Sequence, residues 1–123
     1  MTRIVLVGAA SREFGPATLR DIWLSEPLLE EGVDVVLVDL DAEGLEATRA
    51  YADALAVRTG HEISIDVTTD LEEGLAGADF VVMAIELHRY FYWAQDFHIP
   101  RALGFRQIYG ENGGPGGLFH ALR

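Results

Sequence analysis

The stretch from residue 3 to residue 23 has the pattern of a buried strand, a tight turn and a helix. Residues 4–7 are four consecutive apolar residues, as expected for a parallel strand that is covered on both faces. Gly8 permits a sharp turn because it has no Cβ, and Pro16 suits the first turn of a helix, where its missing N–H is not needed. Apolar residues then recur at helical spacing over residues 19–23. The sequence therefore predicts a strand that faces the amino end of a helix, where a pyrophosphate can bind.

The turn matches the dinucleotide fingerprint only in part. In the pattern G-x-G-x-x-G the three glycine positions are occupied by Gly8, Ala10 and Glu13. Ala10 is small enough to let the backbone approach a phosphate, whereas Glu13 brings a carboxylate near it unless the side chain turns outward. The turn alone is thus equally compatible with a dinucleotide site and with an ordinary strand–helix corner.

The composition excludes several classes of protein. The 123 residues, half of them hydrophobic, correspond to about one globular α/β domain. No apolar run approaches the ~20 residues of a membrane helix, and a strand follows the first residues directly, so we expect neither a membrane span nor a secretory signal. The net charge of -11 disfavours nucleic acids and anionic membranes. There are no cysteines, and we expect a cytoplasmic protein.

A second buried strand is predicted at residues 33–39, and it ends in an acid. In a dinucleotide-binding unit the acid at this position accepts hydrogen bonds from the adenosine ribose. Asp39 follows Gly8 by 31 residues, which exceeds the usual ~20, but a polar connection at residues 25–32 can absorb the difference. Asp39 would disfavour a 2′-phosphate and so favours NAD over NADP. The alternative is that Asp39 only ends a strand.

The order of elements continues as alternating helices and strands. The sequence predicts a helix from its N-cap Asp41 to about Arg58, ended by Gly60. A strand follows at residues 63–67, and one of its faces is more polar, as expected near a sheet edge. The capping-box pair Asp70 and Glu73 predicts the start of a short helix, and a buried strand is predicted at residues 80–85. This β-α-β-α-β-α-β order predicts a Rossmann-like, doubly wound parallel sheet.

The remaining part of the chain differs from a plain nucleotide-binding unit. Within residues 86–105, five aromatic side chains at positions 90–93 and 97 lie in one predicted helix, and they either pack in a core or contact a ligand. The glycine-rich segment at residues 110–117 is predicted to be irregular, and a helix is predicted to begin at residue 118. Because sheets of this type normally continue past the fourth strand, we expect residues 1–123 to be an incomplete nucleotide-binding domain.

Four segments together resemble glycoside hydrolase family four, the NAD- and metal-dependent glycosidases whose first domain is similar to that of lactate and malate dehydrogenases. They are VLVGAASREFGPATLRDI, VVLVDLD, GADFVVMAI, and DFHIP followed by GENGGPGGLFHALR. The last is the most specific. The resemblance covers essentially the whole chain, but only the first quarter to third of a family member.

The resemblance implies an unusual chemistry, an exception to the two-carboxylate scheme of most glycosidases. Bound NAD⁺ removes hydride from C3 of the sugar, a base removes the C2 proton, and the glycosidic bond breaks by elimination. Water then adds and the cofactor returns the hydride. A divalent metal, usually Mn²⁺, polarises the sugar oxygens.

The resemblance also implies site residues. Those for the cofactor are Gly8, Ala10, Ser11 and Phe14 in the turn, and Asp39 at the ribose. Glu111 and Asn112 match the loop that borders the sugar. The family's metal ligands, a Cys and a His, and its Tyr base have no counterpart here, so we expect this chain alone to hydrolyse nothing. The four histidines show no metal-ligand spacing.

The substrate class follows from one difference. The phospho-sugar branches of the family have an Arg shortly before the D-x-x-I-P motif, and here Trp93 occupies the aligned position, although Arg89 is near. An Arg suits phosphate recognition, so we expect an unphosphorylated α-glucoside, α-galactoside or uronide, bound by a homo-oligomer. Two alternatives remain open: a 2-hydroxy-acid dehydrogenase of the malate or lactate type, and a nucleotide-binding module without chemistry of its own.

Overall fold

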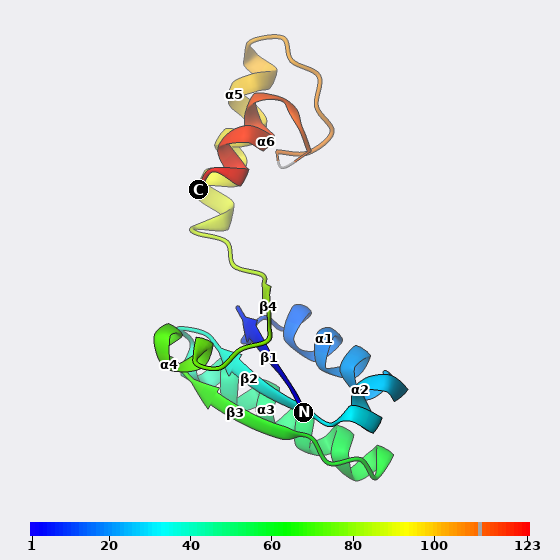
Figure 1. The fold of residues 1–123 in the computed structure, drawn as a ribbon. Coiled ribbons are helices and arrows are strands. Elements are labelled where there is room, and N and C mark those ends of the chain that lie inside the picture. Colours follow the sequence, from blue (N-terminus) through cyan, green and yellow to red (C-terminus); the bar gives the residue numbers. More distant parts are fainter. Residues whose placement is uncertain (111) are drawn as a thin grey trace. The chain divides into compact units, whose positions relative to one another are not determined.

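The computed structural model describes residues 1–110 and 112–123, and it divides into two compact units, Met1–Ile85 and Glu86–Arg123 (Figure 1). The first holds β1 (Thr2–Val7), α1 (Phe14–Trp23), α2 (Glu26–Glu31), β2 (Val33–Val38), α3 (Ala42–Thr59), β3 (Ser64–Thr68), α4 (Leu71–Leu75) and β4 (Phe80–Met83). The second holds α5 (Arg89–Ala102) and α6 (Gly114–Ala121).

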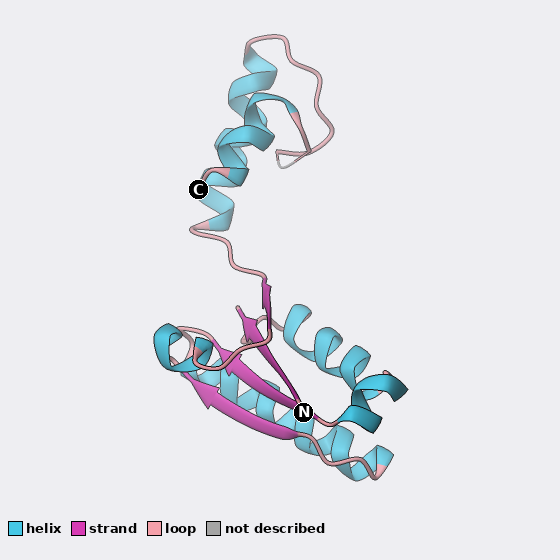
Figure 2. Ribbon diagram, in the orientation of Figure 1, coloured by secondary structure: helices cyan, strands magenta, loops and turns pink. Residues whose placement is uncertain are grey.

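The first unit is built on a four-stranded sheet with the order β3-β2-β1-β4 (Figure 2). Every neighbouring pair is parallel, and Val7 at the end of β1 lies opposite Val38 of β2 and Met83 of β4. The chain adds strands outward from β1 to β3 and then returns to place β4 on the other side of β1. The order therefore reverses between β1 and β4, which is the point where ligands bind in sheets of this kind.

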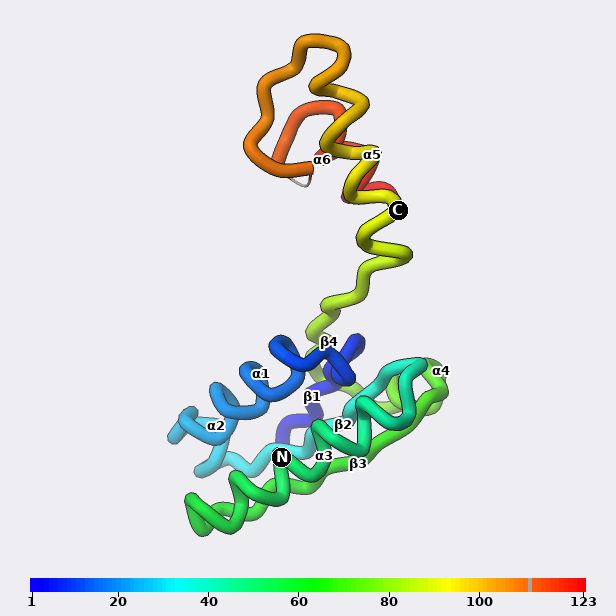
Figure 3. The backbone as a smooth tube through the Cα atoms, turned by 180° about the vertical axis from the view of Figure 1, so that it is seen from behind, coloured from blue at the N-terminus to red at the C-terminus, as the bar shows by residue number. Residues whose placement is uncertain are grey.

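Helices cover both faces of the sheet. Because successive side chains of a strand point to opposite faces, Ile4 and Leu6 contribute to the core beneath α1 and α3, whereas Val5 and Val7 belong to a smaller apolar cluster on the other face. Figure 3 shows α1 and α3 side by side on the first face. On the opposite face α4 approaches β2 so closely that a Cβ at Gly74 would lie 2.4 Å from Cγ2 of Val38. The predicted doubly wound Rossmann-like sheet is confirmed.

The local signals for two helices are confirmed as well. The Asp41 carboxylate accepts a hydrogen bond from the Gly44 N–H and caps α3, which ends at Gly60 in the left-handed conformation with φ 74°. The Asp70 carboxylate caps α4 by accepting from the Glu73 N–H at 3.0 Å. Only this half of the predicted capping box forms, because the Glu73 carboxylate accepts from the Thr68 hydroxyl instead.

Two expectations for the first unit were wrong. Residues 25–32, expected to be a connection, contain the short helix α2, with Pro27 in its first turn. The strand expected to be buried at residues 80–85 is exposed: β4 leaves 63% of Phe80 and 62% of Met83 accessible. The reason is that β4 is the outer strand of this sheet and, in the described part of the chain, no helix packs closely against its two faces.

In the second unit residues 114–117 of the glycine-rich segment are helical, contrary to expectation, and α6 begins at Gly114 rather than at residue 118. Pro115 lies in the first turn, where a helix tolerates proline. Gly116 is required by packing, since a Cβ there would lie 2.1 Å from the carbonyl oxygen of Asp96 in α5. Close contact between α5 and α6 thus outweighs the low helix propensity of glycine.

None of the helices in the part of the chain that the structure describes combines the length and the apolar character of a membrane-spanning helix.

Candidate functional site

The turn after β1 is fixed to the two neighbouring strands. Gly8 has φ 92°, and a Cβ on it would lie 2.2 Å from the carbonyl oxygen of Ala84, just beyond β4. The N–H groups of Gly8 and Ala9 both donate to the Val38 carbonyl at the end of β2, at 2.9 and 3.2 Å. A side chain at position 8 is therefore excluded both by conformation and by space.

Asp39 joins the end of β2 to this turn. One carboxylate oxygen, Oδ2, accepts from the Ala10 N–H at 3.0 Å, and the other, Oδ1, accepts from the Asp41 N–H at 3.1 Å. The residue is half-buried. A carboxylate has about four lone-pair positions, so Asp39 can hold the turn and still accept hydrogen bonds from a diol.

The first turn of α1 leaves donors for an anion. The Ser11 hydroxyl oxygen accepts from the Phe14 N–H at 3.2 Å, and the Ser11 carbonyl accepts from the Gly15 N–H at 3.2 Å. Within the part of the chain that the structure describes, the N–H groups of Arg12 and Glu13 make no hydrogen bond. The Glu13 side chain is exposed. Two backbone N–H groups at the positive end of a helix suit an anion.

Gly15 and Thr48 pack against the Ala9 carbonyl in the turn, and neither residue was predicted to belong to the site. A Cβ at Gly15 would lie 2.2 Å from the Ala9 carbonyl oxygen, and the buried Thr48 hydroxyl donates to the same oxygen at 2.9 Å. Close packing of helix on strand is the task of the third glycine in the dinucleotide fingerprint. Here Gly15 performs it, two positions after Glu13, and the signal was the Gly15–Pro16 dipeptide at the helix start.

Ala10 has a partner that makes room for its methyl group. A Cβ built on Gly44 in the first turn of α3 would lie 2.7 Å from the Ala10 Cβ. The Ala10 methyl group is therefore directed at α3. Replacement of the second fingerprint glycine by alanine is matched by a glycine in the facing helix.

A hollow of about 500 Å³ adjoins the turn between the amino ends of α1 and α3. It is lined by Ala10, Arg12, Pro16, Asp41, Glu43, Gly44, Ala47, Thr48 and Tyr51. The charged groups on it are two carboxylates and one guanidinium, so its surroundings do not favour an additional phosphate.

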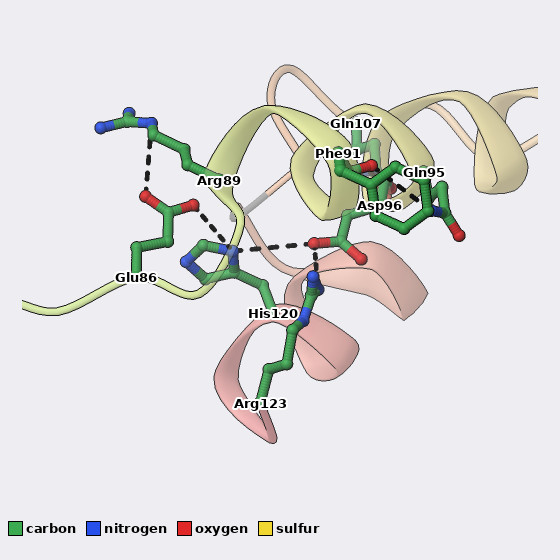
Figure 4. Close-up of polar contacts among 8 residues, drawn as sticks. All are labelled: Glu86, Arg89, Phe91, Gln95, Asp96, Gln107, His120 and Arg123. Atoms are coloured by element: carbon green, nitrogen blue, oxygen red, sulfur yellow. Dashed lines mark hydrogen bonds and ion pairs between the residues drawn. The ribbon is translucent and has the colours of Figure 1, made fainter.

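The second unit contains a polar cluster centred on Asp96, shown in Figure 4. The buried Asp96 carboxylate pairs with Arg123, and His120 Nδ1 lies 3.7 Å from its Oδ2. His120 Nδ1 also lies 3.8 Å from Glu86 Oε1, while Arg89 Nε lies 3.3 Å from Glu86 Oε2. The two arginines of the cluster are thus already paired with carboxylates.

The structure brings the predicted cofactor residues together in the first unit, since the turn from Gly8 to Phe14 adjoins Asp39. Asn112 lies in the second unit, is exposed, and donates its N–H to the Tyr109 carbonyl at 3.4 Å. Glu111 lies outside the described residues. Of the aromatic residues in α5, Tyr90 and Phe91 are exposed, and Trp93 stacks on Phe97 with 6.0 Å between ring centroids.

A parallel sheet that reverses its order beside a glycine turn, with an acid at the end of the adjacent strand, defines the Rossmann class of nucleotide-binding folds. The model of the family 4 glycosyl hydrolases matches residues 3–123. The chain belongs to this family.

Three known proteins illustrate the likeness. An alpha-glucosidase of Erwinia rhapontici is 43% identical over 123 residues, which are 99% of this chain and 27% of that protein. An alpha-galacturonidase of Thermoanaerobacter italicus is 32% identical over 98% of this chain and 25% of its own length. A 6-phospho-alpha-glucosidase from gut microorganisms, solved with NAD and Mn²⁺, is 27% identical with a TM-score of 0.73 over 98% of this chain and 27% of that chain. The chain thus spans about a quarter of the length of these relatives.

Proposed function

We propose that this chain is the NAD-binding portion of a glycosidase that cleaves O-glycosidic bonds. The observation that carries the proposal is the hydrogen bond between Ala10 and Asp39, which places a ribose-type acid beside a glycine turn at the switch point of the sheet. Family membership favours this function over a 2-hydroxy-acid dehydrogenase.

The residues of the first unit fit the cofactor. Gly8 allows close approach to the pyrophosphate, and the Arg12 and Glu13 N–H groups with the Ser11 hydroxyl are donors for its oxygens. Phe14 contributes through its N–H, which holds the Ser11 side chain in place. Asp39 accepts from the ribose hydroxyls.

The preference for NAD over NADP rests on charge. A 2′-phosphate beside Asp39 would lie close to the negative charge of its carboxylate. The adjoining hollow has two further carboxylates, Asp41 and Glu43, and one guanidinium, Arg12. Like charges in close contact are costly. We therefore propose NAD as the cofactor.

When bound, NAD⁺ would reversibly accept hydride from C3 of the sugar. This oxidation of C3 would prepare the elimination across C1 and C2. The residues described here bind and orient the dinucleotide: the turn holds the pyrophosphate and Asp39 fixes the ribose. The Asn112 amide, exposed in the second unit, is proposed to border the sugar.

An unphosphorylated glycoside is the proposed substrate. Arg89, the cation that could have replaced the arginine of the phospho-sugar branches, pairs with Glu86, and Arg123 pairs with Asp96. A sugar phosphate would have to displace a carboxylate from either guanidinium. The names of the alpha-glucosidase and alpha-galacturonidase relatives carry no phosphate, which supports the same substrate class.

The metal does not fit the residues at hand. Among residues 1–110 and 112–123 no three His, Cys, Asp or Glu side chains form a group that could hold an ion. We propose Mn²⁺ as a cofactor of the glycosidase because the related 6-phospho-alpha-glucosidase was solved with it, and we assign it no residue of this chain.

A homo-oligomer in the cytoplasm is also proposed. The outer strand β4 exposes Phe80 and Met83, and an unpaired apolar strand edge favours association. Sedimentation velocity of the purified chain tests this: a single monomeric species at micromolar concentration would contradict it.

Calorimetric titration with NAD⁺ and NADP⁺, together with a thermal melt, tests the cofactor proposal. Saturable NAD⁺ binding that is at least about tenfold tighter than NADP⁺ binding is expected. A cooperatively folded chain that binds neither would contradict it. NAD⁺ binding without turnover of a glycoside, even when the downstream gene product is supplied, would instead favour the non-catalytic module.

A further inference from the structure

The carboxyl end of α5 brings two arginines to one hollow in the second unit. Arg101 lies in the last turn of the helix, Gly104 ends it in the left-handed conformation with φ 87°, and Arg106 follows this turn. The hollow has a volume of about 570 Å³. It is lined by Arg101, Gly104, Phe105, Arg106, Gln107 and Ile108. Among the described residues it therefore has two guanidinium groups and no carboxylate.

Most other arginines of the chain have a carboxylate as partner. Those with such a partner are Arg3, Arg20, Arg49, Arg89 and Arg123. Arg101 and Arg106 are exposed and form no ion pair with any carboxylate that the structure describes. The chain has a net charge of -11, but at physiological ionic strength charges more than about 8 Å away are largely screened. The two guanidinium groups thus dominate the field inside the hollow.

One of the two guanidinium groups is held by an aromatic ring. The Arg101 Cζ lies 5.0 Å from the centroid of the Phe97 ring. Stacking on a ring leaves the N–H donors at the edge of the guanidinium plane available, and it lowers the entropy that a bound anion would cost. The backbone N–H groups of Arg106 and Gln107 also donate to no acceptor that the structure describes. The hollow therefore adjoins several donors without a partner.

The carboxyl end of a helix carries partial negative charge, which opposes an anion. Here the Pro100 and Arg101 carbonyls already accept hydrogen bonds from the N–H groups of Phe105 and Gly104, at 3.0 and 3.1 Å. The opposing charge is about half a unit, whereas Arg101 and Arg106 contribute two full charges. The balance favours an anion.

We propose that Arg101 and Arg106 form a binding site for a phosphate group. A phosphate has enough oxygens to accept from two guanidinium groups at once, whereas one guanidinium already uses both oxygens of a carboxylate. A phosphate dianion also balances the two positive charges. The inference goes beyond the proposed function and does not depend on it, since neither arginine is a predicted cofactor or sugar residue. The source of the phosphate group is inorganic phosphate or a small phosphate ester.

Titration of the ¹⁵N-labelled 123-residue chain with inorganic phosphate, followed by NMR, tests the proposal. The titration is made at about pH 8, where the dianion prevails, and sodium chloride keeps the ionic strength constant. Saturable shifts of the amides of residues 104–107 are expected, with a dissociation constant of about 1–10 mM because the site is exposed. Arg101→Gln and Arg106→Gln are each expected to weaken binding by at least about fivefold.

The matched control is Arg58→Gln. Arg58 is an exposed arginine in the last turn of α3, it has no ion-pair partner among the described residues, and it does not line the hollow. Its replacement is expected to leave the affinity within about twofold. The double variant Arg101→Lys, Arg106→Lys keeps both charges but loses the planar donors, so affinity at least about threefold weaker than that of the unmodified chain is expected.

Three results would each overturn the proposal: no saturable shift with phosphate, equal weakening by Arg58→Gln, or full affinity in the double lysine variant. Acetate is expected to bind at least about fivefold more weakly than phosphate, and equal affinity for acetate would also overturn it. Titration with glycerol 2-phosphate separates the two sources. Tighter binding of the ester supports an esterified phosphate as the ligand, and tighter binding of inorganic phosphate supports the free anion.

Discussion

The Ala10 N–H donates to Oδ2 of Asp39 at 3.0 Å, across 29 positions of sequence. The acid at the end of β2 therefore organises the turn after β1 before any ligand is present. Its other oxygen, Oδ1, holds the Asp41 N–H at the start of α3. One carboxylate thus connects the amino ends of both helices on this face of the sheet.

We expect Asp39→Ala to weaken NAD⁺ binding by at least about tenfold, because the ribose loses its acceptor and the Ala10 N–H loses its partner. Calorimetry measures the change. The control is Asp53→Asn, an exposed carboxylate of α3 whose one ion-pair partner among the described residues is Arg49, and unchanged affinity is expected. If Asp39→Ala bound NAD⁺ normally, the ribose acid would have to be sought elsewhere, with Asp41 the next candidate.

The close approach of Ala10 and Gly44 can be tested with one substitution that weakens NAD⁺ binding and a second that restores it. Gly44→Ala would place a Cβ 2.7 Å from the Ala10 Cβ, so we expect the turn to shift and NAD⁺ affinity to fall by roughly three- to tenfold. The double variant Ala10→Gly, Gly44→Ala is expected to recover most of the affinity. The new Cβ would also approach Asp41 Oδ2 at 2.8 Å, so full recovery is not expected. A double variant as weak as Gly44→Ala would show that the two residues are not coupled.

Much of the first unit could be predicted because its signals are local. A few adjacent residues are enough to predict the apolar run of β1, the acid after β2, and the caps Asp41 and Asp70. The structure has each of these features at the predicted position. The strand order then follows from short crossovers. The exposure of β4 could not be predicted, since it depends on which strands and helices lie beside it.

Residues selected by long-range packing were the ones that sequence reasoning missed. Gly15 matters because the Ala9 carbonyl lies where its Cβ would be, and Gly116 because the Asp96 carbonyl does. Neither spacing matches a standard fingerprint, and the run of glycines before residue 118 predicted a loop on propensity alone. Helix–strand packing requires the glycine at position 15, and helix–helix packing requires the one at position 116. Such packing can be recognised only when the positions of the elements in space are known.

Gly15→Ala is expected to destabilise the chain by about 1–3 kcal/mol, since the added methyl group would lie 2.2 Å from a backbone oxygen that cannot move aside cheaply. A thermal melt by circular dichroism measures this as a lowered Tm. Thr18→Ala, on the same helix and without a hydrogen bond through its side chain in the described part of the molecule, is the control, and we expect a change within about 0.5 kcal/mol. A Tm of Gly15→Ala equal to that of the control would show that α1 can move away from the turn at little cost.

The 123-residue chain is expected to release no nitrophenol from p-nitrophenyl α-D-glucopyranoside, even with saturating NAD⁺ and Mn²⁺. In the proposed mechanism a metal would polarise the sugar oxygens, and a base would take the C2 proton after NAD⁺ has accepted hydride from C3. The described residues offer no group of three metal ligands. Absorbance of the released nitrophenolate over hours, beside a family 4 glycosidase as positive control, measures the release. Release that is abolished by EDTA and restored by Mn²⁺ would contradict the prediction, and would mean that this chain forms a metal site when the sugar and cofactor bind.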